Sequence, residues 1–423
     1  MLTKQFFLCA ACICASLHLF AQSTWKTLPS SPGISSTEGR IDDVFFLNKT
    51  EGWCASGGGN IYHTSNGGDS WTKQLAVLPN PYFRCIEFRN PQLGFAGTLD
   101  KKLFRSTDGG TNWTNIAPNI TPIPQAVCGL SIPTDSTVYA VGEWDEPAFL
   151  LKSNDAGLTW INKSMATQAK GLVDVLFTSR DTGWVSGMGI GGATILRTVD
   201  GGATFTELFN SGFSGEYVWK LQRVTPLVWV GSIQSMTFTN GRIVKSIDGG
   251  LTWTAIPAPI SDMQGIGFAT PLRGWVGGYN SGFYETKDGG STWTFQFFGG
   301  NYNRFYFLDS TFAYASGNRI YKFSPESSSI IEANRSPNEN FDFELNPNPA
   351  TGQTQVRFNL SQPDNIRISL LSTNGVELRN LHKRHYDMGD HSVQIDLTNI
   401  PSGTYLIWMQ RNHGLFTKPF VVR

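Results

Sequence analysis

The residues that could carry out chemistry are few and scattered along this chain of 423 residues. His63 is the only histidine between residues 22 and 340, so a multi-histidine metal site is excluded there, and a Ser-His-Asp mechanism would depend on this one side chain. Loose carboxylates such as Asp174, Glu216 and Asp262 lie near predicted strands, but no spacing pairs them for acid–base work, and we expect them in turns or on the surface. We therefore expect no catalytic residue, no metal site and no cofactor.

The cysteines and the overall charge exclude further classes of function. Three of the six cysteines fall within residues 1–21, which leaves Cys54, Cys85 and Cys128, an odd number without metal-ligand spacing. All three lie in apolar runs, so buried free thiols are expected rather than a disulfide framework. The formal net charge is +0 and only 16% of the residues are charged, which argues against a nucleic-acid partner.

One eight-residue pattern, Ser-Ile-Asp-Gly-Gly-Leu-Thr-Trp at residues 246–253, recurs along the chain and is typical of a tight turn between two strands. The Asp248 carboxylate can accept hydrogen bonds from backbone N–H groups just ahead of it, and the glycines supply positive φ angles. The hydroxyl residues and the closing Trp complete the turn. The other copies occupy residues 64–71, 106–113, 153–160, 198–205 and 286–293, with Asn66, Asp108, Asp155, Asp200 and Asp288 in the position of Asp248.

The spacing of these turns predicts an all-β propeller. Their closing aromatic residues stand at 71, 113, 160, 205, 253 and 293, so the repeat lengths are 42, 47, 45, 48 and 40 residues, enough for four short strands each. Residues 305–323 form a seventh unit that lacks such a turn and stops after three strands. Residues 23–28 resemble the strand that comes after a turn elsewhere, and we expect them to complete the last unit. Residues 22–325 are thus predicted to form a seven-bladed β-propeller closed by its N-terminal strand.

The two ends of the chain have different characters. Residues 1–21 have a positive start and an apolar centre, which is typical of a secretory signal peptide; the run is short for a membrane span. Residues 326–340 are polar and predict a linker. Residues 341–423 alternate apolar and polar positions in several short runs, which predicts a small Ig-like β-sandwich.

The repeated turn resembles the Asp box, or BNR repeat, of bacterial sialidases and related propellers. In those families the box lies on the face opposite the catalytic centre, so the resemblance implies a structural role for all six copies. Sialidases also need an Arg-Ile-Pro motif, which this sequence lacks: Arg40 is followed by Ile41 and Asp42. The whole repeat region more closely resembles the photosystem II assembly/stability factor family, whose members are single propellers that act as protein-binding scaffolds.

The C-terminal region resembles the sorting domain of type IX secretion cargo. The resemblance rests on Asn-Pro-Asn-Pro at residues 346–349, Ser-Thr-Asn-Gly at 372–375 and Pro-Ser-Gly-Thr-Tyr at 401–405. It implies the type IX secretion machinery as a partner, a Gram-negative host, and a protein that is released or held at the outer-membrane surface without a transmembrane segment. A carbohydrate-binding or adhesive module is the alternative interpretation.

These resemblances predict a non-catalytic protein-binding or scaffold module, with a glycan-active hydrolase or a glycan-binding adhesin as alternatives. The binding face is expected opposite the boxes, where variable loops gather around the mouth of the propeller channel. Aromatic side chains with adjacent charges suit protein or sugar contacts there, although packing between blades is the alternative role for each of them. The candidate ligand-binding residues are Tyr82, Arg84, Trp144, Asp145, Tyr217, Trp219, Tyr302 and Arg304.

Overall fold

The computed structural model describes residues 23–32, 39–145, 147–235, 241–279, 282–296, 298–325, 341–372, 377–411 and 414–423. The predicted signal peptide at residues 1–21 and the predicted linker at 326–340 lie outside these residues. The chain divides into two compact units, residues 1–326 and 327–423. The described regular structure is β-strand apart from one 3-10 turn, η1 (Ala117–Asn119), which confirms the all-β class. No helix within the described ranges is long and apolar enough to cross a membrane.

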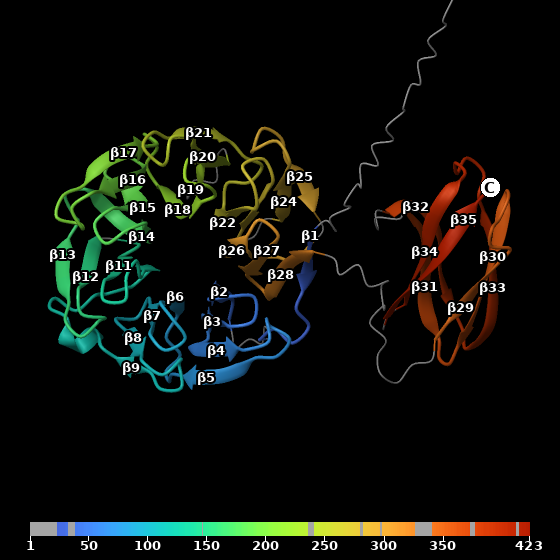
Figure 1. Ribbon diagram of the computed structural model, residues 1–423, viewed down its shortest axis with the longest axis horizontal. Helices are drawn as coiled ribbons and strands as arrows, with labels where there is room; N and C mark the ends of the chain where they lie inside the picture. Colours follow the sequence, from blue (N-terminus) through green and yellow to red (C-terminus); the bar gives the residue numbers. More distant parts are fainter. Residues whose placement is uncertain are drawn as a thin grey trace, which may run out of the picture. The chain divides into compact units, whose positions relative to one another are not determined.

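The described part of the first unit contains seven four-stranded antiparallel sheets, here numbered 1 to 7 in chain order of their first strands. Figure 1 shows the sheets arranged around a common centre, with the labelled first strands β2, β6, β14, β18, β22 and β26 nearest to it. The first strands are β2 (Ile41–Phe46), β6 (Phe83–Phe88), β10 (Gly129–Ser131), β14 (Ala169–Phe177), β18 (Glu216–Arg223), β22 (Met263–Phe268) and β26 (Arg304–Asp309). The second strands are β3 (Gly52–Ser56), β7 (Gly94–Thr98), β11 (Val138–Gly142), β15 (Gly183–Gly189), β19 (Trp229–Ser235), β23 (Gly274–Gly278) and β27 (Phe312–Ser316).

The outer strands complete each sheet. The third strands are β4 (Asn60–Thr64), β8 (Leu103–Ser106), β12 (Phe149–Ser153), β16 (Ala193–Thr198), β20 (Arg242–Ser246), β24 (Phe283–Thr286) and β28 (Ile320–Pro325). The fourth strands are β5 (Thr72–Ala76), β9 (Thr114–Asn115), β13 (Ile161–Ser164), β17 (Thr206–Asn210), β21 (Thr254–Pro257), β25 (Thr294–Gln296) and, in sheet 7, β1 (Ser23–Thr27). Burial falls from centre to rim: β2 and β3 are buried throughout, whereas no residue of β5 is buried.

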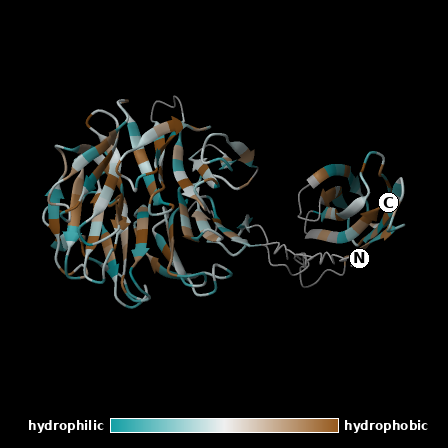
Figure 2. Ribbon diagram, turned by 45° about the horizontal axis from the view of Figure 1, so that its top comes forward, coloured by the Kyte–Doolittle hydropathy of each residue, from teal (hydrophilic) through white to brown (hydrophobic). Residues whose placement is uncertain are grey.

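The glycine that opens several second strands has a steric cause. Phe46 closes β2 directly opposite Gly52, and a Cβ atom on that glycine would lie 2.4 Å from the Phe46 ring. Gly94 stands in the same relation to Phe88. The aromatic ring therefore lies flat across the neighbouring strand, which only glycine permits. The rings fill the space between adjacent sheets. Figure 2 shows hydrophobic positions, in brown, along the strands of this unit.

The N-terminal strand is part of the last sheet, as the sequence predicted. β1 pairs antiparallel with β28, with Trp25 opposite Phe323 and Ser23 opposite Pro325. The Trp25 ring lies 5.6 Å from that of Trp275 in sheet 6 and 5.2 Å from that of Phe323 in sheet 7, measured between ring centroids. β1 thus covers the outer edge of sheet 7 and supplies the large aromatic residue that a box supplies elsewhere.

The second unit consists of two sheets around one apolar core. One sheet has the order β29 (Phe343–Asn346), β30 (Gln353–Leu360) and β33 (Gly389–Asp396). The other has the order β32 (Glu377–Tyr386), β31 (Asp364–Ser372), β34 (Gly403–Arg411) and β35 (Gly414–Val422). Both contribute to the core, for example Val356 and Phe358 from β30, and Ile368 and Met409 from β31 and β34.

Candidate binding site

Each Asp-box carboxylate is used inside its own turn. The Oδ1 atom of Asp248 accepts hydrogen bonds from the Thr252 N–H at 2.9 Å and the Ser246 hydroxyl at 2.8 Å, and Oδ2 accepts one from the Thr252 hydroxyl at 2.6 Å. These bonds, the Thr252 hydroxyl foremost, hold the pKa of Asp248 well below its usual value. Gly249 and Gly250 have φ angles of +81° and +80°, which other residues adopt only with strain. Asn66, Asp108, Asp155, Asp200 and Asp288 each accept the corresponding N–H bond from the residue four positions later.

The boxes also connect neighbouring sheets. In each of the six copies, a backbone carbonyl of the box accepts a hydrogen bond from a side chain of the preceding sheet. The donors and acceptors are Trp53 to Gly109, Arg105 to Ala156, Lys152 to Gly201, Trp184 to Gly250, Lys245 to Gly289 and Lys322 to Gly67. The last of these joins sheet 7 to sheet 1. The face that carries the boxes, called the box face, is therefore occupied by structural contacts.

Replacing Asp248 with Ala should loosen sheet 5 and lower the melting temperature without changing what the protein binds. The reason is that Asp248 organises only its own turn, on the box face. Thermal unfolding of the variant measures the effect, with Lys287→Ala, an exposed change in the box of sheet 6, as the control. A folded Asp248→Ala protein with altered binding specificity would contradict the structural role.

At the opposite end of the inner strands, irregular pairing turns several side chains toward the centre. Ile41 pairs with Ser56 and Asp43 with Ala55, so Asp42 between them has no partner across the ladder. The same register shift occurs at Arg84, Trp219 and Gln264 in sheets 2, 5 and 6. A bulge of this kind re-aims the extra side chain. We call this end of the channel the mouth.

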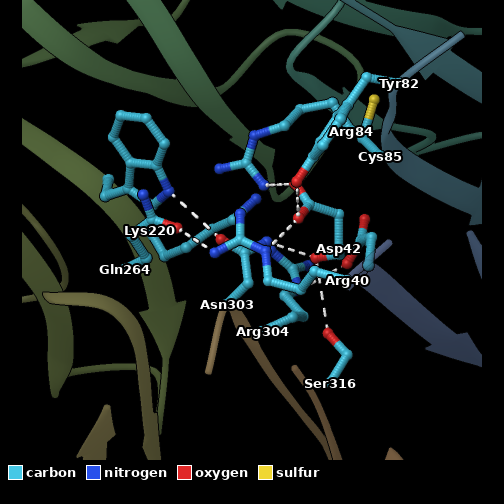
Figure 3. Close-up of polar contacts among 12 residues, drawn as sticks. Arg40, Asp42, Tyr82, Arg84, Cys85, Lys220, Gln264, Asn303, Arg304 and Ser316 are labelled. Atoms are coloured by element: carbon cyan, nitrogen blue, oxygen red, sulfur yellow. Dashed lines mark hydrogen bonds and ion pairs between the residues drawn. The ribbon is translucent and has the colours of Figure 1, made fainter. Parts of the chain in front are cut away.

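Asp42 is the centre of the polar contacts at the mouth (Figure 3). Its side chain is completely buried, its Oδ1 lies 2.5 Å from Nε of Arg40, and its Oδ2 is bonded by Nη1 of Arg84. The Tyr82 hydroxyl donates a hydrogen bond to Oδ1 at 2.7 Å. Burial alone would raise the pKa of Asp42, but the two guanidinium groups outweigh it and the pKa is lowered. Asp42 is therefore ionised, and the three charged groups together carry a net positive charge.

One nitrogen of the Arg84 guanidinium has no hydrogen-bond partner among the described residues. Its side chain is 4% exposed and lies over the Trp219 ring, with 5.0 Å between the guanidinium carbon and the ring centroid. Within the described ranges its Nη2 atom is buried without a hydrogen-bond partner. A buried donor left without a partner costs about 1–3 kcal/mol, and more when it is charged. The arrangement therefore favours an acceptor, preferably an anionic one, in the mouth.

The structure brings together five of the predicted site residues and adds others. Tyr82, Arg84 and Trp219 meet around Asp42, and the Tyr217 ring lies 5.5 Å from that of Trp219 while its hydroxyl bonds the Trp144 carbonyl at 2.8 Å. Tyr217 and Trp219 are themselves buried, so they support the mouth rather than form its surface. The exposed groups are Trp144, which is 39% exposed, and Asp145.

Two predicted residues lie elsewhere. Tyr302 is fully buried, its ring packs against those of Phe283 and Tyr321, and its hydroxyl bonds the Phe298 carbonyl, so it cannot touch a ligand. This part of the prediction is wrong because the residue faces the adjacent sheet and not the channel. Arg304 lies in the channel but in another layer of side chains, 3.5 Å from Asp43 and 3.7 Å from Asp174.

The expectation that the loose carboxylates occupy turns or the surface is also wrong. Asp174, Glu216 and Asp262 are all buried. Asp174 lies 3.3 Å from Lys220, and Glu216 lies 2.5 Å from Arg242. Sequence reasoning missed Arg40, Asp42, Lys220, Gln264 and Asn303 as channel residues. The available signal was that Asp42 and Gln264 each stand at the second position of an inner strand, with Arg40 and Asn303 just before one.

Several channel carboxylates accept backbone hydrogen bonds from the next sheet. Asp43 accepts one from the Ile86 N–H at 3.0 Å, and Asp174 accepts one from the Leu221 N–H at 2.8 Å. Glu87 does the same with the Ile132 N–H at 3.0 Å. These bonds tie the inner strands of consecutive sheets together at the centre, as the boxes do on the box face.

Glu87 should make stability depend on pH. Burial raises its pKa to about 7, and Asp43 and Asp174 add to the rise against the opposing Ile132 amide and Arg304. The folded state then binds a proton that the unfolded state has lost, so stability falls as pH rises from the ordinary value of 4.5 to about 7. Glu87→Gln keeps an acceptor for the Ile132 N–H. It should raise the free energy of unfolding by on the order of 2 kcal/mol at pH 8 and by little at pH 4. Urea unfolding at both pH values measures this, and an equal gain at both would contradict it.

The channel has another opening at the box face. A cavity of about 540 Å³ is lined there by apolar side chains such as Leu221, Phe268 and Phe307, and by the polar groups of Gln222, Arg304 and Tyr306. No group of three or more His, Cys, Asp or Glu side chains within the described ranges is placed to hold a metal ion. Among the described residues, Cys54, Cys85 and Cys128 are buried and form no disulfide, as predicted, and burial raises the pKa of Cys128 to about 12.

Comparison with known proteins finds similarities to both units. Residues 344–423 match the family described as the secretion system C-terminal sorting domain. The chain is 25% identical over 330 residues to the photosystem II assembly lipoprotein Ycf48 of Synechococcus sp. (strain CC9902), which covers 73% of this chain and 90% of that protein. The structure of YCF48 bound to D1 peptide is similar with a TM-score of 0.55 and 16% identity, over 73% of this chain and 98% of that one.

A third similarity is to PorZ of Porphyromonas gingivalis, described as an essential surface component of the type-IX secretion system. Its TM-score is 0.55 at 14% identity, over 91% of this chain and 59% of PorZ. Similar structures also include enzymes, a streptogramin B lyase among them. At such identities these structures establish the β-propeller fold alone. The chain therefore carries a β-propeller similar to Ycf48 and ends in a type IX secretion sorting domain, which directs its export to the cell surface or the extracellular space.

Proposed function

We propose that the mature protein is a non-catalytic scaffold that binds a segment of a partner protein at the mouth of its propeller. In this proposal the seven sheets are the blades of a propeller over residues 22–325, closed by β1. Residues 1–21 are the signal peptide, 326–340 the linker, and 341–423 an Ig-like sorting domain that interacts with the type IX machinery. The seven-sheet arrangement and the pairing of β1 with β28 support this architecture.

The observation that carries the proposed function is the unpartnered Nη2 of Arg84. Arg40 and Arg84 share a single carboxylate, Asp42, so the buried group has one negative charge too few. An acidic side chain or a chain-terminal carboxylate would supply that charge and accept the Arg84 donor. The exposed Trp144 and the 48% exposed Tyr279, over which Arg40 lies at 5.1 Å, offer aromatic contacts around it. The similar YCF48, solved with a bound D1 peptide, supports a peptide as ligand.

The binding test uses a charge-conserving substitution. Arg84→Lys keeps the ion pair with Asp42 but removes the second nitrogen of the fork. On an array of random peptides, the native protein should prefer acidic members, and the variant should bind them about 30-fold less tightly or worse, from the roughly 2 kcal/mol cost of losing a buried charged contact. Arg89→Lys, a half-exposed arginine paired with Asp135 outside the mouth, is the matched control. Equal binding by the Arg84 and Arg89 variants would exclude the mouth as the peptide-binding site.

A glycan-active hydrolase or a glycan-binding adhesin is the second candidate. It is favoured by the box-face cavity and by two carboxylates, Asp43 and Asp174, that contact the same Arg304 guanidinium. Against it, both carboxylates already accept backbone hydrogen bonds from the next sheet. A glycan array and a hydrolysis assay run beside the peptide array separate the candidates. Glycan binding or cleavage that is lost in Asp174→Asn would replace the scaffold proposal.

A further inference from the structure

The loop that joins β11 to β12 at the mouth is held in place by its own backbone. It begins with Glu143 and Trp144. The Glu143 carbonyl accepts a hydrogen bond from the Leu172 N–H at 2.9 Å, and the Trp144 carbonyl accepts one from the Tyr217 hydroxyl at 2.8 Å. A Cβ atom on Gly171 would lie 2.3 Å from the Trp144 carbonyl oxygen, so the close approach of the loop requires glycine there. The loop of sheet 3 is thus fixed to sheets 4 and 5.

This fixed loop presents an aromatic ring to the solvent. Trp144 is 39% exposed, whereas Trp53, Trp229 and Trp275 on the second strands are at most 2% exposed. Those three rings pack between sheets, and Trp144 does not share that role. A large apolar ring is stabilised when a partner covers it, and the face of a tryptophan ring attracts cations. The ring is therefore suited to contact a cationic group of a ligand.

Two carboxylates stand on either side of Trp144 in the chain. The Oε2 atom of Glu143 is buried and has no hydrogen-bond partner among the described residues, and Asp145 is exposed. Burial raises the pKa of Glu143, Asp145 adds to the rise, and Lys101 opposes it, so the two carboxylates lie near each other with one cation nearby. A buried acceptor without a donor is costly. A ligand that brings an N–H group would remove this cost.

The acidic loop lies beside the cationic part of the mouth. The Arg84 guanidinium carbon lies 5.0 Å from the centroid of the Trp219 ring, which is itself 5.5 Å from that of the Tyr217 ring. The Tyr217 hydroxyl in turn holds the loop. Burial raises the pKa of the Cys128 thiol, Arg84 lowers it and Glu143 raises it, so both charges act on the same buried group. The mouth therefore has a cationic and an anionic region next to each other.

We infer that Glu143, Trp144 and Asp145 form a second subsite of the mouth, which binds a lysine or arginine side chain of the bound peptide segment. The inference rests on the proposed function, because it names a second feature of the segment whose acidic group contacts Arg84. The cationic group lies against the Trp144 ring and donates a hydrogen bond to Oε2 of Glu143. An entirely acidic segment would be repelled by the two carboxylates. The mouth thus selects segments that carry both signs of charge over segments that are only acidic.

The test compares matched peptides binding to the full chain. The peptides of a pair share an acidic residue and differ at one nearby position, which is lysine in one and norleucine in the other, so that the ammonium group is the difference. The native protein should bind the lysine member about tenfold more tightly. Trimethyllysine at the same position should bind less tightly than lysine, because it keeps the charge but has no N–H group to donate to Glu143.

Two variants remove parts of the subsite and leave Arg84 in place. Glu143→Gln and Trp144→Leu should each reduce the preference for lysine over norleucine about fivefold or more, while the preference for acidic peptides remains. Asp135→Asn is the matched control and should change neither preference, because Asp135 is an exposed acid of the same sheet that pairs with Arg89 on the box face. Glu143→Gln should melt at no lower temperature than the native protein, because the buried oxygen has no partner to lose.

The outcomes separate this inference from the proposed function. If acidic peptides bind through Arg84 but lysine and norleucine peptides bind equally, the mouth is the peptide site and the second subsite is wrong. A lysine preference that persists in both Glu143→Gln and Trp144→Leu, or equal binding of lysine and trimethyllysine, would also overturn the subsite as described. A lysine preference that depends on Glu143, with acidic binding unchanged in Arg84→Lys, would keep the subsite and overturn the role proposed for Arg84. Binding of no peptide at all would overturn both.

Discussion

Trp25→Ala is expected to lower the free energy of unfolding by about 3 kcal/mol, near the lower end for large aromatic truncations because the ring is only partly buried. The Trp25 ring contacts Trp275 of sheet 6 and Phe305 and Phe323 of sheet 7, so its loss opens a cavity between the two sheets. It also weakens the hold of β1 on β28 and exposes an outer edge. Chemical denaturation monitored by fluorescence and by circular dichroism measures the loss.

The control for this prediction lies on the same strand. Lys26 is next to Trp25, is exposed, and keeps the same backbone pairing with Lys322, so Lys26→Ala should change stability by less than about 0.5 kcal/mol. Equal effects of the two substitutions would mean that the Trp25 ring does not hold the last sheet. A small effect of both would mean that β1 contributes little to closure.

Asp42→Ala is expected to lower the free energy of unfolding by about 3–5 kcal/mol, because it leaves two buried arginines without their shared counter-ion. Arg40 retains Gln264 and Asn301 as partners at 2.7 and 2.9 Å, whereas Arg84 loses the one carboxylate that it contacts among the described residues. The loss should also abolish any preference for acidic peptides that depends on the geometry of Arg84. Urea unfolding at neutral pH checks the stability, and the peptide array checks the preference.

Two further variants separate charge balance from general damage to the mouth. Asp145→Ala removes an exposed carboxylate from the mouth and should be neutral within about 0.5 kcal/mol. The double change Asp42→Leu with Arg84→Met replaces the ion pair by apolar groups and should recover much of the loss, since such replacements are often close to neutral. A double variant as unstable as Asp42→Ala would show that packing, rather than an unbalanced charge, sets the cost.

The parts of the fold that could be predicted from the sequence are those that depend on contacts close in the chain. An Asp box forms its hydrogen bonds within eight residues, as between Asp248 and Thr252, so its structure can be predicted from the local sequence. The glycine opening a second strand is likewise explained by the aromatic residue six positions before it, as with Gly52 and Phe46. The position of β1 could be predicted because its sequence copies the strand that comes after a box.

The mouth could be predicted only in part because its contacts join residues far apart in the chain. Asp42 meets Arg84 across one repeat, and Arg40 meets Gln264 across five. Composition also could not separate Tyr302, which faces the next sheet, from Tyr82, which faces Asp42, since both are tyrosines one or two residues before an inner strand. The bulges that decide the direction of these side chains depend on strand register, which no single repeat displays.

The pairing of β1 with β28 has a mechanical consequence. Ser23 and Pro325 are opposite each other at the same end of an antiparallel ladder, so the chain enters and leaves sheet 7 side by side. A force that pulls these two residues apart acts across the ladder and loads its hydrogen bonds one pair at a time, as in opening a zipper. Tension applied between the two ends of the propeller chain should therefore peel β1 away at low force before any other strand yields.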